Sequence, residues 1–187
     1  MLAYVFWHWP QPGVDTETYV DHLVSFHRIL NENKPAGFHG SRVFRMHGVS
    51  WLDTTGDAYE DWYLLDDSAA LDRINEAAVT GVCEAPHNLV AREAAGGTAG
   101  LYRIKIGSVV DEPRFATWLS KPAGISYTDF YVTLEPNLTG ALWQRQMTLG
   151  PTSEFLIHSA GEIRLPEAWT ASQVLTLQSV GSDRSQP

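Results

Sequence analysis

The side chains best suited to chemistry in this sequence are histidines, because imidazole exchanges a proton near neutral pH more readily than any other side chain. Three of the seven histidines stand out: His8 ends an aromatic segment, His27 lies on the flank of an expected helix, and His87 follows Pro86 at the start of a helical segment. We expect these three to be the catalytic candidates, which would remove or relay a proton. The alternative for each is a structural histidine that only makes a hydrogen bond.

Other kinds of catalytic site have little support in the sequence. The histidines form no HExxH pair and the single Cys83 has no CxxC partner, so we expect no metal site. No GxGxxG, Walker or GxSxG sequence is present, which argues against a nucleotide cofactor and a serine nucleophile, and we expect no cofactor. The adjacent Glu60 and Asp61 should face opposite sides of a strand. One of them is therefore expected to enter a cavity, where burial would raise its pKa and make it a usable base.

The composition favours a globular protein that is rich in aromatic side chains. The chain has 187 residues, is 44% hydrophobic and contains seven each of Trp, Tyr and Phe. Such side chains fill cores and also build flat-walled ligand pockets. The net charge of −9 disfavours nucleic acid as a partner. There is no apolar run of eighteen residues, and the start "MLAYVFWHWP" lacks the basic segment of a signal peptide, so we expect no membrane association and a cytoplasmic location.

A strand at residues 2–9 carries most of the aromatic residues expected at the site. This segment is β-branched and aromatic, and it stops at Pro10. Its alternation puts Tyr4, Phe6 and His8 on one face and Val5, Trp7 and Trp9 on the other. A change of one residue in register exchanges the two sets, so the sequence leaves open which face lines a cavity. The residues expected to bind the ligand are Tyr4, Phe6, Trp7 and Trp62.

The rest of the chain suggests an order of strands and helices that occurs twice. An amphipathic helix is expected from residue 15, then strands at 38–48 and 58–67 and two helical segments between 68 and 94. In the second half we expect a strand at 101–107, a short helix within 111–124, strands at 126–136 and 141–150, and a final strand at 172–181. Residues 153–169 stay open, because "EFLIH" alternates like a strand where the repeat requires a helix.

The tetrapeptide Lys-Pro-Ala-Gly occurs at residues 34–37 and again at 121–124. Proline and glycine both favour the end of a helix, and each copy follows a helix-like stretch. We therefore interpret the two copies as equivalent corners of two unequal repeats. The pair Gly96-Gly97 is expected to mark a linker between them, which gives repeats at 1–97 and 98–187.

Strand-helix-strand-strand-helix-strand is the order of the ferredoxin-like unit. The segment "YVDHLVSFHRILNENKPAGFHGSRVFRM", residues 19–46, resembles the first helix and returning strand of EthD-like proteins. These belong to the dimeric α/β barrel superfamily, together with antibiotic-biosynthesis monooxygenases. The resemblance implies an α+β fold with two tandem ferredoxin-like repeats whose antiparallel sheets face each other, and it puts His27 at the histidine position of the family. Near the corresponding place the second half has Trp118 and Leu119 instead of a histidine, which implies one site per chain.

The resemblance also implies where a ligand would bind. Helices would cover the outer faces of the sheets, and the ligand cavity would lie between the two sheets. We expect a small apolar or aromatic ligand there and, if the protein is an enzyme, cofactor-independent oxygenation or isomerisation of an activated carbon acid. Two alternatives remain: a non-catalytic binding or stress-response module, and a haem-binding barrel with a histidine as axial ligand. An exposed edge strand would favour a homodimer.

Overall fold

The computed structural model describes residues 1–146 and 152–181. The helices are α1 (Thr16–Glu32), α2 (Ser68–Ala78), α3 (Gly81–Glu93) and α4 (Tyr127–Leu134), which a short 3-10 turn, η1 (Glu135–Asn137), follows. The strands are β1 (Leu2–Pro10), β2 (Phe38–His47), β3 (Asp57–Leu65), β4 (Ala94–Gly107), β5 (Phe115–Leu119), β6 (Gly140–Arg145), β7 (Phe155–Ser159), β8 (Ala171–Thr176) and β9 (Gln178–Ser179).

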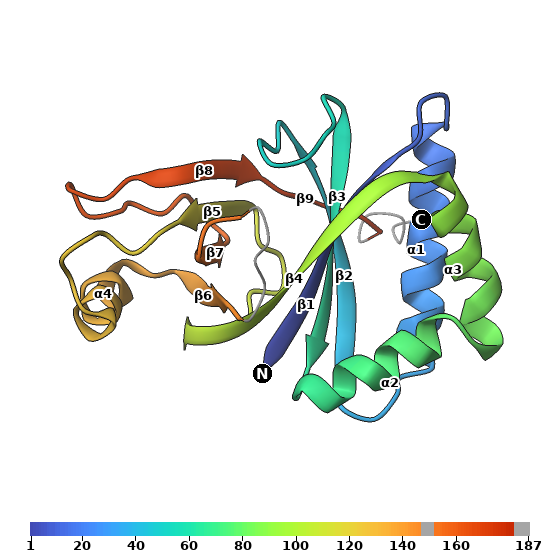
Figure 1. Ribbon diagram of the computed structural model, residues 1–187, viewed down its shortest axis with the longest axis horizontal. Coiled ribbons are helices and arrows are strands. Elements are labelled where there is room, and N and C mark those ends of the chain that lie inside the picture. Colours follow the sequence, from blue (N-terminus) through green and yellow to red (C-terminus); the bar gives the residue numbers. More distant parts are fainter. Residues whose placement is uncertain (147–151, 182–187) are drawn as a thin grey trace, which may run out of the picture.

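These strands form one antiparallel sheet in the order β8-β5-β7-β6-β4-β1-β3-β2-β9. Helices α1, α2 and α3 lie on one side of the molecule and α4 on the other, with the strands between them (Figure 1). The orders β4-β1-β3-β2 and β8-β5-β7-β6 are each the order of a ferredoxin-like unit. The expected α+β fold of two tandem ferredoxin-like repeats is therefore confirmed, with α4 and the loop 160–170 replacing the three helices in the second repeat.

The long strand β4 joins the two repeats. It pairs with β1 along its first part and with β6 along its last part. The segment around Gly96-Gly97 belongs to this strand, so the linker expected there is wrong, and the expected boundary between 97 and 98 falls inside β4. The glycines serve packing instead, because a Cβ at Gly97 would lie 2.4 Å from the ring of Phe6 and one at Gly96 would lie 2.8 Å from the ring of Trp9.

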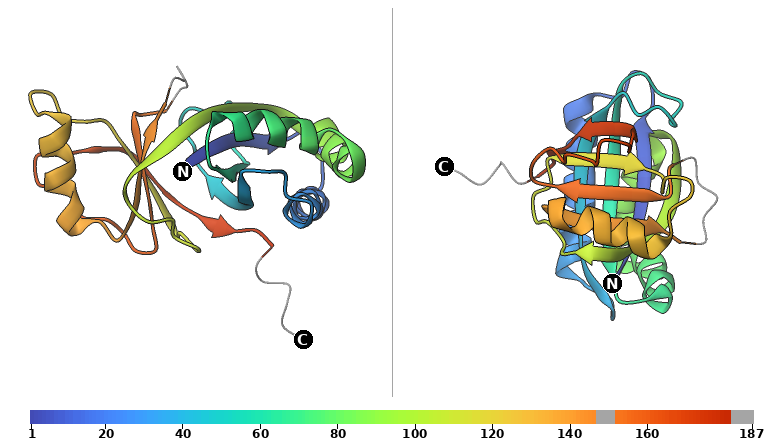
Figure 2. Two further views of the ribbon diagram at one scale, coloured as in Figure 1. Left: turned by 90° about the horizontal axis from the view of Figure 1, so that it is seen from below. Right: turned by 90° about the vertical axis from the view of Figure 1, so that its left-hand side faces the viewer.

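The final segment of the described chain closes the sheet into a barrel. Strand β8 pairs with β5 at one end of the sheet, and β9, one residue later, pairs with β2 at the other end. Gln173 adds hydrogen bonds from this segment to Ser50 and Gly48 in the loop after β2. Figure 2 shows β8 and β9 running across from one half of the molecule to the other.

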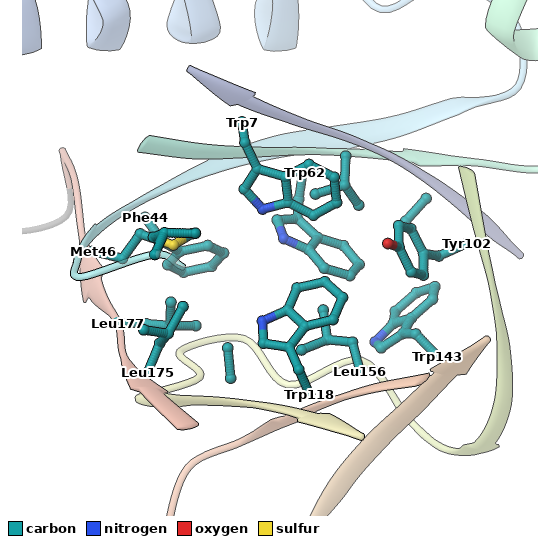
Figure 3. Close-up of a cluster of buried hydrophobic side chains, with 14 of the residues drawn as sticks. Trp7, Phe44, Met46, Trp62, Tyr102, Trp118, Trp143, Leu156, Leu175 and Leu177 are labelled. Atoms are coloured by element: carbon teal, nitrogen blue, oxygen red, sulfur yellow. The ribbon is translucent and has the colours of Figure 1, made fainter. Parts of the chain in front are cut away.

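Large aromatic side chains fill the interior of this barrel (Figure 3). The indole rings of Trp7 and Trp118 meet edge-on at 5.7 Å, and those of Trp62 and Trp143 at 5.0 Å. The space beside Trp62 and Trp143 amounts to only about 10 Å³. The ligand cavity expected between the two sheets is therefore wrong, because four tryptophans, with Phe44 and Tyr102, occupy that volume.

The elements of the first half agree with the sequence pattern, whereas two elements of the second half are exchanged. Residues 115–119 form strand β5 instead of a helix, and residues 127–134 form helix α4 instead of a strand. The segment "YTDFYVTL" is rich in residues that favour strands. It is helical because Ser126 caps it: the Ser126 hydroxyl accepts from the backbone N–H of Asp129 and donates to the Asp129 carboxylate. The open segment 153–169 contains strand β7, followed by a loop.

The two Lys-Pro-Ala-Gly segments are not equivalent corners. The first lies between α1 and β2, whereas the second lies between β5 and α4, which is the corner before the first helix of its repeat. The two repeats exist, but the repeated tetrapeptide does not relate them.

Among the helices that the structure describes, none has the length and apolar character needed to span a membrane.

Candidate functional site

A cavity of about 670 Å³ lies between the first repeat's sheet and its three helices. Its floor consists of side chains from β1 and β3, which are neighbours in the sheet and place Phe6 opposite Asp61 and Tyr4 opposite Tyr63. Alternation along β1 therefore directs Tyr4, Phe6 and His8 toward the helices, and Trp7 into the barrel. The walls come from the helices, with Leu23 and Phe26 from α1, Leu71, Asp72, Ile74, Asn75 and Ala78 from α2, and His87, Val90 and Ala91 from α3.

At the floor, a buried carboxylate lies between two histidines. Asp61 Oδ1 is 3.1 Å from His8 Nε2, and Asp61 Oδ2 is 3.2 Å from His27 Nε2. The side chains of His8, Asp61 and His27 are 1%, 4% and 5% exposed. The structure thus brings together two histidines that are nineteen positions apart in the sequence, and Asp61 is the residue that joins them.

Hydroxyl groups contact the other ring nitrogen of each histidine. His8 Nδ1 is 2.6 Å from the hydroxyl of Tyr19, and His27 Nδ1 is 2.7 Å from the hydroxyl of Ser41. The Tyr63 hydroxyl donates to Asp61 Oδ2 at 3.2 Å. Every ring nitrogen of the two histidines therefore has a polar neighbour, which fixes the orientation of both rings.

The electrostatics of the cluster favour an ionised carboxylate. Burial alone would raise the pKa of Asp61, but His8 and His27 outweigh it and hold that pKa well below its ordinary range. The raised carboxylate pKa expected from the sequence is therefore wrong for Asp61. Burial, and then the charge of Asp61, raise the pKa values of Tyr4, Tyr19 and Tyr63, so their hydroxyls stay protonated.

Neither histidine forms an aligned hydrogen bond with Asp61, although both lie within ion-pair distance of it. His8 Nε2 and Asp61 Oδ1 are close, but their geometry lacks hydrogen-bond alignment, and no other hydrogen bond reaches either atom. Both residues line the cavity, whereas the predicted catalytic residue His27 is not part of the lining. A ligand group at the floor can therefore supply the bond that these two atoms lack.

The other residues expected at the site separate into two groups. Tyr4, Phe6 and His87 line the cavity, with His87 on the helix wall, where its ring meets that of Phe26 edge-on at 5.6 Å. His87 lies inside α3, which begins at Gly81 and not after Pro86 as expected. Trp7 and Trp62 point into the barrel, on the opposite face of the sheet from the cavity.

In the barrel, Trp7 and Trp62 hold a second buried carboxylate. Their indole N–H groups donate to Glu60 at 2.6 and 2.5 Å, and His158 Nε2 lies 3.1 Å from Glu60 Oε1. Glu60 is 0% exposed. The expectation that Glu60 and Asp61 face opposite sides of the sheet is confirmed, and Asp61 is the one that reaches the cavity.

The residues that sequence reasoning missed are Tyr19, Ser41 and Tyr63. Tyr19 shows the spacing of a core residue of α1, and its second role depends on how that helix packs on β1. Tyr63 lies two positions after Asp61 on β3 and therefore on the same face, which is a signal that could have been used. Ser41 carries no sequence signal, because its contact with His27 arises only when α1 packs beside β2.

The cavity does not fit a haem group. Its lining includes two carboxylates, Asp61 and Asp72, and no lysine or arginine among the described residues that could pair with the two propionates of haem. The Nε2 atoms of His8 and His27 both face Asp61. Of the three candidate histidines, only His87 could then serve as an axial ligand of the iron. Within residues 1–146 and 152–181, no group of three or more His, Cys, Asp or Glu side chains could hold a metal ion.

The second repeat fills the equivalent space between its strands and α4. Phe130 of α4 stacks on Trp169 of the loop 160–170, with ring centres 4.9 Å apart, and it contacts Phe155 at 4.6 Å. Leu119, Leu134 and Ile157 complete this apolar cluster. The loop thus supplies a large ring where the first repeat has its second and third helices and its cavity.

No protein-family model and no curated protein matches the sequence. Two solved structures are similar over nearly the whole chain. One, described as a "putative chlorite dismutase", has a TM-score of 0.52 at 12% identity and covers 96% of this chain and 95% of its own. The other, a "putative monooxygenase" from Lactobacillus acidophilus, has a TM-score of 0.52 at 11% identity and covers 95% of this chain and 93% of its own. At such identities the likeness concerns the fold alone: the chain has the dimeric α/β barrel fold, with both halves in one polypeptide.

Proposed function

We propose that the protein binds a small, largely apolar aromatic molecule in the cavity between the first sheet and α1–α3, and removes a proton from it. The observation that carries this proposal is the His8–Asp61–His27 cluster, of which His8 and Asp61 line the floor of that cavity. The volume of about 670 Å³ lies within the range of about 300–1,000 Å³ that is usual for small-molecule sites. The rings of Tyr4 and Phe6 on the floor and of Phe26 on the helix wall supply flat apolar surfaces.

His8 is the proton acceptor in this proposal. When its Nδ1 proton is donated to the Tyr19 hydroxyl, Nε2 carries the lone pair. Asp61, 3.1 Å from Nε2, then stabilises the imidazolium that forms. His27 and Tyr63 hold the other oxygen of Asp61 and so keep the carboxylate in place.

Proton removal is the step that cofactor-independent oxygenation and isomerisation of a carbon acid share. The oxyanion that such a step creates needs a hydrogen-bond donor. The Tyr4 hydroxyl supports this role, because Tyr4 lines the floor and its phenol is protonated at neutral pH. One structural neighbour is described as a "putative monooxygenase", which agrees with an oxygenation reaction.

Anthrone tests this proposal, because it is an aromatic ketone with an activated methylene group. Loss of a proton gives the anthrone anion, which reacts with O₂ to give anthraquinone and water. We expect the wild-type protein to accelerate oxygen uptake and quinone formation above the spontaneous rate. The variant His8→Gln should lose about a hundredfold or more of that acceleration, as for loss of a general base.

The matched control is His22→Gln, since His22 also pairs with a carboxylate, Glu93, but outside the cavity. This variant should keep the wild-type rate. If anthrone raises the melting temperature of the protein and yet no variant changes the rate, proton removal is wrong and the cavity belongs to a non-catalytic binding module.

A further inference from the structure

The cavity lining that the structure describes contains acidic side chains but no lysine or arginine. Asp61 lies at the floor and Asp72 on the α2 wall. Asn75 of α2 and His87 of α3 are the remaining polar groups on the helix walls. An anionic ligand would therefore meet two carboxylates without a cation to pair with, and it would lose its water on entering.

The donors around Asp61 are unevenly distributed. The Tyr63 hydroxyl donates to Oδ2 at 3.2 Å, and His27 Nε2 forms an ion-pair contact with the same atom at 3.2 Å. Oδ1 has only His8 Nε2 nearby, at 3.1 Å and without alignment. A buried carboxylate normally accepts several hydrogen bonds, so Oδ1 lacks a donor that the protein does not supply.

We propose that the ligand is an uncharged aromatic molecule with an acidic hydroxyl group, a phenol or an enol, whose O–H points to the Asp61–His8 pair, and that the site rejects aromatic carboxylates. This inference rests on the proposed function and names its substrate class. The hydroxyl donates its hydrogen bond to Asp61 Oδ1, and its proton can then pass to His8 Nε2, which lies 3.1 Å from that oxygen.

The aromatic part of the ligand is supported by the walls. On the floor, the rings of Tyr4 and Tyr63 lie 5.8 Å apart and tilted by 39°, and the ring of Phe6 stacks on that of His8 at 5.3 Å. On the helix side, Phe26 faces the same space. A flat ring between these side chains buries apolar surface, while its hydroxyl points to the floor.

Three probes with the same ring system separate the contributions: 2-naphthol, naphthalene and 2-naphthoate. Their dissociation constants are measured at pH 7 by calorimetry and by displacement of a fluorescent probe. We expect 2-naphthol to bind at least about tenfold more tightly than naphthalene, the effect of one hydrogen bond to a charged group. We expect 2-naphthoate to bind at least about tenfold more weakly than 2-naphthol.

Variants test whether Asp61 causes the preference for 2-naphthol over 2-naphthoate. Asp61→Asn removes the charge with little change in shape, and the preference for 2-naphthol over 2-naphthoate should fall to about threefold or less. His8→Gln keeps the Asp61 charge, so it should bind 2-naphthol more weakly than wild type and still exclude 2-naphthoate. This variant replaces Asp61→Asn in the test if Asp61→Asn fails to fold. Glu76→Gln changes an exposed carboxylate of α2 outside the cavity lining and should leave all three constants unchanged.

The outcomes separate the two proposals. If 2-naphthoate binds wild-type protein as tightly as 2-naphthol, the ligand class is wrong, although the cavity still binds aromatic molecules. The ligand class is also wrong if wild type, Asp61→Asn and His8→Gln all show the same preference for 2-naphthol over 2-naphthoate. If none of the three probes binds, the proposed aromatic site itself is wrong, and the ligand class is overturned with it.

Discussion

Glu60 and Asp61 are neighbours in the sequence, yet each is the centre of a different polar cluster. Glu60 faces the dry barrel and accepts from two indole N–H groups, whereas Asp61 faces the cavity and lies between two histidines. His158 also lies beside Glu60, but this pair is enclosed by the packed barrel, whereas Asp61 and His8 line a cavity that a ligand can enter. The period-2 alternation of β3 therefore separates a structural carboxylate from one that is suited to proton transfer.

The lowered pKa of Asp61 predicts how stability depends on pH. An unfolded aspartate has a pKa of about 3.9, and the folded value lies below it. The ionised carboxylate therefore contributes stability that is fully present above about pH 3.9 and is lost as the pH falls through the folded pKa. We expect the free energy of unfolding, measured with urea from pH 7 downward, to fall more steeply below about pH 4 in wild type than in Asp61→Asn.

The control for this measurement is Asp72→Asn, because Asp72 is exposed on α2. Its loss should leave the wild-type pH dependence in place. Equal slopes for wild type and Asp61→Asn below about pH 4 would contradict the ionised state that we assign to Asp61.

At the scale of elements, the glycines of β4 shape the cavity floor. The ring of Phe6 lies over Gly97, where a Cβ would be 2.4 Å from ring atom Cζ and 3.0 Å from the backbone oxygen of Trp7. Gly97→Ala should push the Phe6 ring from its position above β4 and into the cavity. We expect 2-naphthol to bind about tenfold more weakly to this variant, with a loss of stability of about 1–3 kcal/mol from overpacking, measured by calorimetry and urea unfolding.

Gly161→Ala is the matched control, because a Cβ at Gly161 meets nothing within 4 Å. It should change neither affinity nor stability by a measurable amount. Wild-type affinity in Gly97→Ala would mean that the Phe6 ring can move away from the cavity, and that β4 does not limit the size of the site.

The sequence predicts the elements of the first repeat well, because helix α1 and strands β1–β3 combine clear periodicity with clear end signals. It predicts His8 and His27 as candidates because imidazole exchanges a proton near neutral pH, and the structure places both beside Asp61. Their meeting at Asp61 was not predictable, because it depends on the register of β1 against β3 and on the packing of α1.

In the second repeat, local signals conflict. The composition of residues 127–134 favours a strand, while the capping pair Ser126 and Asp129 favours a helix, and the cap agrees with the structure. The cavity was expected on the wrong side of the sheet because alternation defines two faces without saying which face meets the other sheet. The volumes of the tryptophans could have decided this, since four indoles leave little room in a small barrel.

At the scale of the whole molecule, two repeats of one fold have different roles. The first keeps three helices and a cavity, whereas the second closes its space with Phe130, Phe155 and Trp169. The aromatic barrel between them supports β1 and β3 from behind, so the side chains at the cavity floor rest on a packed layer. The second repeat thus acts on the site through the sheet, as a rigid support.

The segment β8–β9 joins the two ends of the sheet within one chain. It covers the edges of β5 and β2, and Leu175 and Leu177 enter the barrel core from it. A chain that ends at residue 170 would expose both edges and lose these two leucines. Since open strand edges pair with other chains, we expect the shortened protein to form dimers or larger assemblies, measured by light scattering after size-exclusion chromatography.

A chain that ends at residue 181 keeps both β8 and β9 and is the control. It should elute with the mass of the full-length protein, while the chain that ends at residue 170 should have a higher mass and a lower melting temperature. Each lost leucine contact costs about 2–5 kcal/mol, which is a large part of the stability of one domain. A shortened chain with the same mass and melting temperature as the control would mean that the two repeats hold together through β4 and β6 alone, and that β8–β9 does not close the barrel in solution.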